Sequence, residues 1–151
     1  MIDSDTALTR CEDLIAIARR MGADAADAAA RASASESVSV RLGKLEEVER
    51  SESEEIGLRV FIGQRSASIS ASDMNPATLG TLVERCIAMA REAPEDPYAG
   101  LAPEDRLLKK RPPSLDLTDE EEPEPAALRE RALMAEDAAR GVPGITNSEG
   151  G

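Results

Sequence analysis

The sequence predicts an α+β fold, in which a mostly antiparallel sheet of four or five strands carries two helices on one face. Apolar residues recur at helical spacing over residues 5–21 and 76–93. Between these stretches apolar and polar residues alternate, which is typical of strands with one buried face. Glycine-containing pairs separate the alternating runs, as expected for tight turns between antiparallel neighbours. The 151 residues are enough for one such domain with an appendage.

The first helix is predicted over residues 5–21, where Ser4 or Asp5 can cap the start and Gly22 suits the left-handed residue that ends a helix. Its apolar stripe comprises Leu8, Cys11, Ile15 and Ala18, with Leu14 and Met21 beside it. The alanine-rich stretch 23–31 follows, and helix propensity alone would extend the helix through it.

The central region predicts a meander of four strands. Val38, Val40 and Leu42 alternate with polar residues, and Gly43–Lys44 indicates a tight turn. The return strand, 45–51, breaks the alternation between Leu45 and Val48, which indicates a bulge. A third strand is predicted over 57–62 and a fourth over 67–71. Serines alternate through the fourth strand, so one face of the sheet is expected to be polar and exposed to water.

The second helix is predicted to begin at Asn75–Pro76, with asparagine as the cap and proline at the first helical position, and to end at Pro94. Its apolar face comprises Leu79, Leu82, Val83, Cys86, Ile87 and Ala90. Residues 101–124 contain a short basic cluster, two adjacent prolines and an acidic tract, and predict an exposed, extended connector. A third helix is predicted over 125–140, with an apolar face that comprises Leu128, Ala132, Ala135 and Ala139. The predicted divisions are therefore a domain at 1–100, a linker at 101–124, and a helix with the start of a truncated C-terminal domain at 125–151.

The turn that follows the second helix holds the only tyrosine of the chain, Tyr98, between Pro94 and Pro97. Prolines restrict the unfolded chain, and a lone aromatic side chain beside them favours a packed anchor. We therefore expect Tyr98, with the two prolines, to fasten this turn to the body of the domain.

Composition excludes several classes of function. A net charge of −12 and a pI near 4.5 argue against binding to DNA, RNA or anionic membranes. No apolar run is long enough to cross a bilayer, and the acidic amino terminus lacks the pattern of a signal peptide, so we expect a cytoplasmic protein. Cys11 and Cys86 are predicted to be reduced, buried thiols. The chain contains no histidine, which removes the usual general base and the commonest zinc ligand.

Four stretches, Val40–Gly43, Gly57–Val60, Pro94–Leu101 and Thr146–Gly150, occur in an order that resembles the amino-terminal region of PmbA/TldE proteins. These proteins are one half of the TldD/PmbA metalloprotease family, historically described as modulators of DNA gyrase. The resemblance extends over most of the chain, from Leu14 onward. It implies that the alanine-rich stretch forms a strand rather than a helix. It also implies that the chain is an amino-terminal fragment, because family members continue into a large second domain.

For function, the resemblance implies a non-catalytic subunit that pairs with a TldD-like protease subunit to process or degrade small unfolded peptides. The zinc is expected in that partner, which carries a His-Glu-x-x-x-His motif. No position here matches the motif, so we assign this chain no catalytic, cofactor-binding or metal-ligating residue. The glutamates between positions 46 and 55 lack the spacing of a calcium loop and favour a solvated strand face. The alternative is a stand-alone acidic protein-interaction module without a proteolytic role, which a genuine stop codon after Gly151 would favour.

Overall fold

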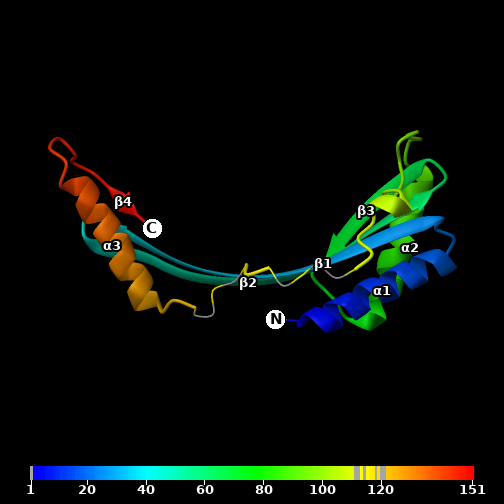
Figure 1. The fold of residues 1–151 in the computed structure, drawn as a ribbon, viewed down its shortest axis with the longest axis horizontal. Coiled ribbons are helices and arrows are strands. Elements are labelled where there is room, and N and C mark those ends of the chain that lie inside the picture. The colour runs from blue at the N-terminus through cyan, green and yellow to red at the C-terminus, as the bar shows by residue number, and fades with distance from the viewer. Residues whose placement is uncertain (1, 111–112, 114, 118, 120–121) are drawn as a thin grey trace. The chain divides into compact units, whose positions relative to one another are not determined.

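The computed structural model describes residues 2–110, 113, 115–117, 119 and 122–151 (Figure 1). In chain order it contains α1 (Ser4–Arg20), β1 (Ala25–Arg41), β2 (Lys44–Ile62), β3 (Arg65–Ala71), α2 (Pro76–Glu92), the short 3-10 helix η1 (Glu104–Arg106), α3 (Pro125–Arg140) and β4 (Glu149–Gly150). The strands form one sheet in the order β3-β2-β1-β4. This arrangement confirms the predicted α+β fold with an antiparallel sheet.

The described residues group into two compact units, one within 1–33 and 53–111 and the other within 34–52 and 112–151. Strands β1 and β2 contribute residues to both units, whereas the sequence placed all of 1–100 in a single domain. We call the group that contains α1 and α2 unit 1 and the group that contains α3 unit 2. In the connector predicted at 101–124, the described residues are all exposed, and η1 is the one helical turn among them.

Unit 1 has an aliphatic core in which both long helices pack against the same face of the sheet. Alternate residues of β2, namely Ile56, Leu58 and Val60, are at most 1% exposed and meet the buried faces of α1 and α2. The placement of two helices on one face is therefore confirmed. The apolar face predicted for α2 is also confirmed, since five of its six residues are buried and Leu82 is partly buried against the core.

The start of α1 differs in detail from the prediction. Asp3, rather than Ser4 or Asp5, caps the helix, because its carboxylate accepts hydrogen bonds from the backbone N–H groups of Asp5 and Thr6. Leu14 is fully buried, whereas Leu8 from the predicted stripe is 60% exposed. The end of the helix is as predicted, since Gly22 has a φ of +99°.

The alanine-rich stretch forms the first half of β1, which confirms the strand that the family resemblance implied and overrides helix propensity. The strands predicted separately at 45–51 and 57–62 are one continuous strand, β2, so that boundary was wrong. Alternation is weak in the first half of β2 because residues 44–53 are exposed, so burial imposes no pattern there. The fourth strand is confirmed as β3, and its Ser68 and Ser70 are exposed.

Unit 2 consists of the turn end of β1 and β2 together with α3 and β4. The turn lies at Leu42–Gly43, one residue earlier than predicted, and both residues have positive φ (49° and 77°). This conformation fits the right-handed twist of a two-residue hairpin, although it is uncommon for leucine. α3 matches the predicted bounds, but it buries Ala132 and Glu136. Ala135 and Ala139, which the apolar spacing favoured, are exposed.

Candidate functional site

The turn with the lone tyrosine lies on the surface. Tyr98 is 92% exposed, so the expectation that its ring packs against the body of the domain is wrong. Asp96 holds the turn instead, because its backbone N–H donates to the Gln64 carbonyl at 2.7 Å and its carboxylate accepts from the Tyr98 N–H at 2.9 Å. Pro94 and Pro97 are also exposed, and their effect on the unfolded chain stays a prediction.

Both cysteines are free and buried in unit 1, which confirms the predicted buried thiols. The Cys86 thiol donates to the backbone carbonyls of Ala67 at 3.4 Å and Leu58 at 3.7 Å. Burial raises the pKa of both thiols. Because the thiolate is the reactive form, these cysteines are poor nucleophiles and poor metal ligands.

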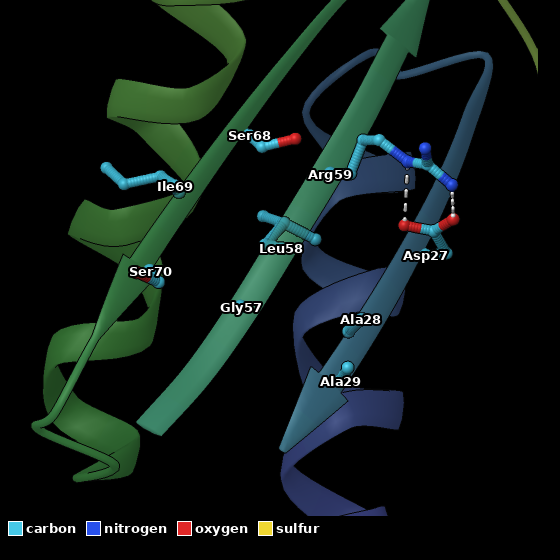
Figure 2. Close-up of a pocket in the computed structure, with 9 residues that line it drawn as sticks. All are labelled: Asp27, Ala28, Ala29, Gly57, Leu58, Arg59, Ser68, Ile69 and Ser70. Atoms are coloured by element: carbon cyan, nitrogen blue, oxygen red, sulfur yellow. Dashed lines mark hydrogen bonds and ion pairs between the residues drawn. The ribbon is translucent and has the colours of Figure 1, made fainter. Parts of the chain in front are cut away.

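The uncovered face of the unit 1 sheet contains a shallow hollow of about 400 Å³ (Figure 2). Gly57 and Arg59 on β2 lie directly opposite Ser70 and Ser68 on β3, so these four positions share one face of the sheet. Ala29 on β1 lines the same hollow and is exposed. The hollow exists because its floor and walls are glycine, alanine and serine, which project little or nothing above the backbone.

The charged residues that line this hollow neutralise each other. Arg59 forms an ion pair and hydrogen bonds with Asp27 on the neighbouring strand, including one of 3.1 Å from Nε to Oδ1 (Figure 2). The same guanidinium lies 5.1 Å from the centre of the Phe61 ring. The other seven lining residues are alanine, glycine, serine, leucine and isoleucine, so no acid or base lines the hollow apart from the paired Asp27 and Arg59.

A second polar cluster lies in unit 2 around Glu136, which is 1% exposed. Its carboxylate accepts hydrogen bonds from the backbone N–H groups of Leu42 at 2.5 Å and Gly43 at 2.7 Å, and from the Ser148 hydroxyl at 2.9 Å. One carboxylate thus joins α3, the β1–β2 turn and the segment before β4. We call these four residues the Glu136 cluster.

Burial acts to raise the pKa of Glu136, but the hydrogen bonds from Gly43, Ser148 and Leu42, with the nearby Arg140 charge, outweigh it and lower that pKa. The carboxylate is therefore ionised at neutral pH, and both of its oxygens accept hydrogen bonds, which suits a structural role rather than proton transfer. The sequence did not reveal this residue, because a glutamate on an alanine-rich helix is most often a solvated one. The signal that was available is its spacing of four from Ala132, which places both on one face.

The zinc that the family resemblance associates with proteolysis does not fit the residues of this chain. The sequence has no histidine, and both thiols are buried with raised pKa values. Across the described part of the chain, no group of three or more cysteine, aspartate or glutamate side chains is arranged to hold a metal ion. Most of the glutamates between 46 and 55 are exposed, as predicted for a solvated strand face, and Glu54 accepts a hydrogen bond from the Ile2 N–H.

The fold and the matched sequence define the class of protein. Residues 26–90, which run from β1 through most of α2, match the family model described as PmbA/TldA metallopeptidase domain 1. This chain belongs to the PmbA/TldD metallopeptidase family. No helix among the described residues combines the length and apolar character needed to cross a membrane.

Two curated relatives are similar in sequence to most of this chain. The chain is 36% identical over 129 residues to Metalloprotease PmbA of Escherichia coli O157:H7, which covers 85% of this chain and 28% of the relative. It is 33% identical over 125 residues to the Metalloprotease PmbA homolog of Haemophilus influenzae, which covers 83% of this chain and 27% of the relative. The chain thus spans a little over a quarter of the length of these relatives.

Two solved structures share the fold. A Bacteroides thetaiotaomicron protein described as a modulator of DNA gyrase aligns with a TM-score of 0.85 at 22% identity, over 99% of this chain and 34% of that one. TldE from Thermococcus kodakarensis aligns with a TM-score of 0.65 at 20% identity, over 87% of this chain and 29% of that one. At these identities the likeness concerns the fold.

Proposed function

We propose that this chain is the amino-terminal domain of a PmbA/TldE-like non-catalytic subunit. In this proposal it pairs in the cytoplasm with a TldD-like subunit that binds the zinc, and the pair processes or degrades small unfolded peptides. The observation that carries the proposal is a first metallopeptidase domain over residues 26–90 in a chain that contains no histidine. The neutralised Arg59–Asp27 pair and the two buried thiols support a role other than catalysis.

Reconstitution tests this proposal. A full-length protein that contains this domain is mixed with its TldD-like partner, and cleavage of an unstructured peptide is followed by mass spectrometry. We expect the pair to associate and to cleave the peptide, whereas the 151-residue chain alone cleaves none. Zinc content is measured on each subunit separately, and we expect it to follow the partner.

Two results would count against the proposal. Peptide cleavage by the isolated chain, after purification that removes contaminating proteases, would refute the non-catalytic assignment. Failure of the full-length protein to associate with any TldD-like partner would refute the subunit role. That second result would favour the stand-alone acidic interaction module, which the exposed Leu117 next to Asp116 supports.

A further inference from the structure

Lys109 and Lys110 differ from the other basic residues of the chain in where they lie. The sequence contains 18 lysines and arginines. In the described part of the chain, every lysine and arginine except this pair belongs to a helix or a strand. Lys109 and Lys110 lie in neither, and both are exposed. No ion pair among the described residues engages their side chains, so both ammonium groups are accessible to a protein that recognises them.

Backbone conformation decides which basic residues a protease can use. A protease binds several substrate residues in an extended form, so bonds in helices and paired strands are protected until the structure opens locally. Arg19 and Arg20 provide the contrast, because they are also adjacent and exposed but belong to the last turn of α1. Residues 101–110 are all exposed, and η1 is the one helical turn in this range. The lysine pair is therefore the basic site that fits a protease without local unfolding.

The lysine pair lies beside the boundary between the two units. The later segment of unit 1 ends at residue 111, and the later segment of unit 2 begins at residue 112. Cleavage at the pair would leave the whole unit 1 core on one product, because its buried cluster lies within residues 11–90. It would divide unit 2, since residues 34–52 would stay with the first product and α3 and β4 would belong to the second.

Contacts within unit 2 would hold the two products together. The Glu136 carboxylate on α3 accepts hydrogen bonds from the Leu42 and Gly43 N–H groups of the β1–β2 turn. β4 pairs with β1 at two positions, and Ala132 of α3 is buried. None of these contacts involves residues 101–124, so cutting that connector removes none of them. The carboxylate bonds are the stronger, charge-assisted kind.

We propose that Lys109–Lys110 is a cleavage site for a protease that recognises lysine or arginine, and that the two products remain one complex through the contacts of unit 2. In the cleavage, water adds across the peptide bond, so that Lys109 gains a carboxylate and Lys110 gains an amino group. Unit 2 is then assembled from two polypeptides. The inference is independent of the proposed function, because it requires neither a partner subunit nor zinc.

Limited digestion with trypsin tests the site, because trypsin cleaves after both lysine and arginine. The 151-residue chain is digested at low trypsin concentration, and mass spectrometry identifies the products over time. We expect the first cut after Lys109 or Lys110, at least about tenfold faster than after any basic residue in a helix or a strand. Lys109→Gln combined with Lys110→Gln should remove this cut. Arg19→Gln combined with Arg20→Gln makes the same change in net charge on α1 and should leave it unchanged.

Size-exclusion chromatography of the cut protein tests whether the products stay together. Under native conditions we expect both products to elute in one peak at the position of the uncut chain, and in concentrated urea we expect them to separate. Glu136→Ala should release the second product, because it removes the acceptor of the Leu42 and Gly43 N–H groups. Glu130→Ala is the matched control at an exposed position of α3 outside the Glu136 cluster, and it should release none.

Three results would overturn the proposal. One is a first cut within a helix or a strand, or a cutting rate that the lysine substitutions leave unchanged. Another is separation of the two products under native conditions, or an association that Glu136→Ala does not weaken. The third is resistance of the lysine pair in the full-length protein that contains this domain, under conditions in which the 151-residue chain is cut. The rest of the longer polypeptide would then protect the site.

Discussion

Different kinds of interaction stabilise the interior of each of the two units. In unit 1, thirteen buried apolar residues form one cluster between the helices and the sheet. In unit 2, α3 buries only Ala132 and Glu136 and is joined to the β1–β2 turn by hydrogen bonds to a carboxylate. Apolar burial scales with area and tolerates small shifts, whereas the Glu136 cluster depends on fixed geometry and on ionisation. Substitutions and pH should therefore affect the two units differently.

The largest difference is expected from removing core volume. Leu58→Ala deletes a side chain that is 1% exposed in the unit 1 core and should lower the free energy of unfolding by about 2–5 kcal/mol. Leu45→Ala, on the same strand but in unit 2 and 45% exposed, should change it by no more than about 0.5 kcal/mol. Denaturant midpoints measure both. Equal shifts would contradict the assignment of the core to unit 1.

A close backbone contact gives unit 2 its own point of weakness. In Gly150→Ala the new Cβ would lie 2.8 Å from the Ala132 carbonyl oxygen, so β4 or α3 must move, at a cost of about 1–3 kcal/mol. Gly151→Ala is the matched control, because its Cβ has ordinary contacts at 3.5 Å. Amide hydrogen exchange of α3 should accelerate in the first variant and not in the second. Unchanged exchange in both would show that this contact is not limiting.

The pH dependence of unit 2 follows from Glu136. Its pKa in the folded protein is lowered, so its stabilising effect is complete above the pKa in the unfolded chain and is lost as pH falls through the folded pKa. Acidification should therefore lower the protection factors for amide exchange at Leu42 and Gly43, each calculated against the intrinsic exchange rate at the same pH. Glu136→Gln should show lower protection factors already at neutral pH and a flatter dependence of protection on pH. An unaltered pH profile in this variant would assign the effect to another carboxylate.

The smallest effect is expected at Tyr98. Because the side chain is 92% exposed, Tyr98→Ala should change the free energy of unfolding by less than about 0.5 kcal/mol. Asp96→Ala should have the larger effect on this turn, since it removes the acceptor of the Tyr98 N–H. Chemical denaturation of both variants provides the comparison. A larger loss of stability in Tyr98→Ala than in Asp96→Ala would support the original prediction that the aromatic ring anchors this turn.

Much of unit 1 could be predicted from the sequence, because apolar burial imposes a period on each element. The apolar face of α2, the Asn75 cap and β3 were all visible in the spacing of a few residues. Residue patterns did not predict the strand formed by the alanine-rich half of β1. Alanine favours a helix locally, and pairing with the neighbouring strand makes this stretch extended instead. The family resemblance, and not the residue pattern, indicated that this stretch forms a strand.

Most of unit 2 could not be predicted from the spacing of apolar residues. The bounds of α3 follow from proline and glycine, but which face it buries depends on where the turn of the hairpin lies. A positive φ at Leu42 has no sequence signal, and without it the two backbone N–H groups would not converge on Glu136. Tyr98 was misjudged for a related reason, because rarity in the composition carries no information about burial.

The placement of the two cysteines allows thiol labelling to detect opening of the unit 1 core. Cys11 and Cys86 are the only cysteines of the chain, and both lie buried in that unit. A thiol reagent can reach Cys86 only when the sheet and α2 separate, so its labelling rate measures how often that core opens. Opening of unit 2 exposes no thiol and is silent to the same reagent. Labelling kinetics can thus assign an opening event to unit 1 without any engineered probe.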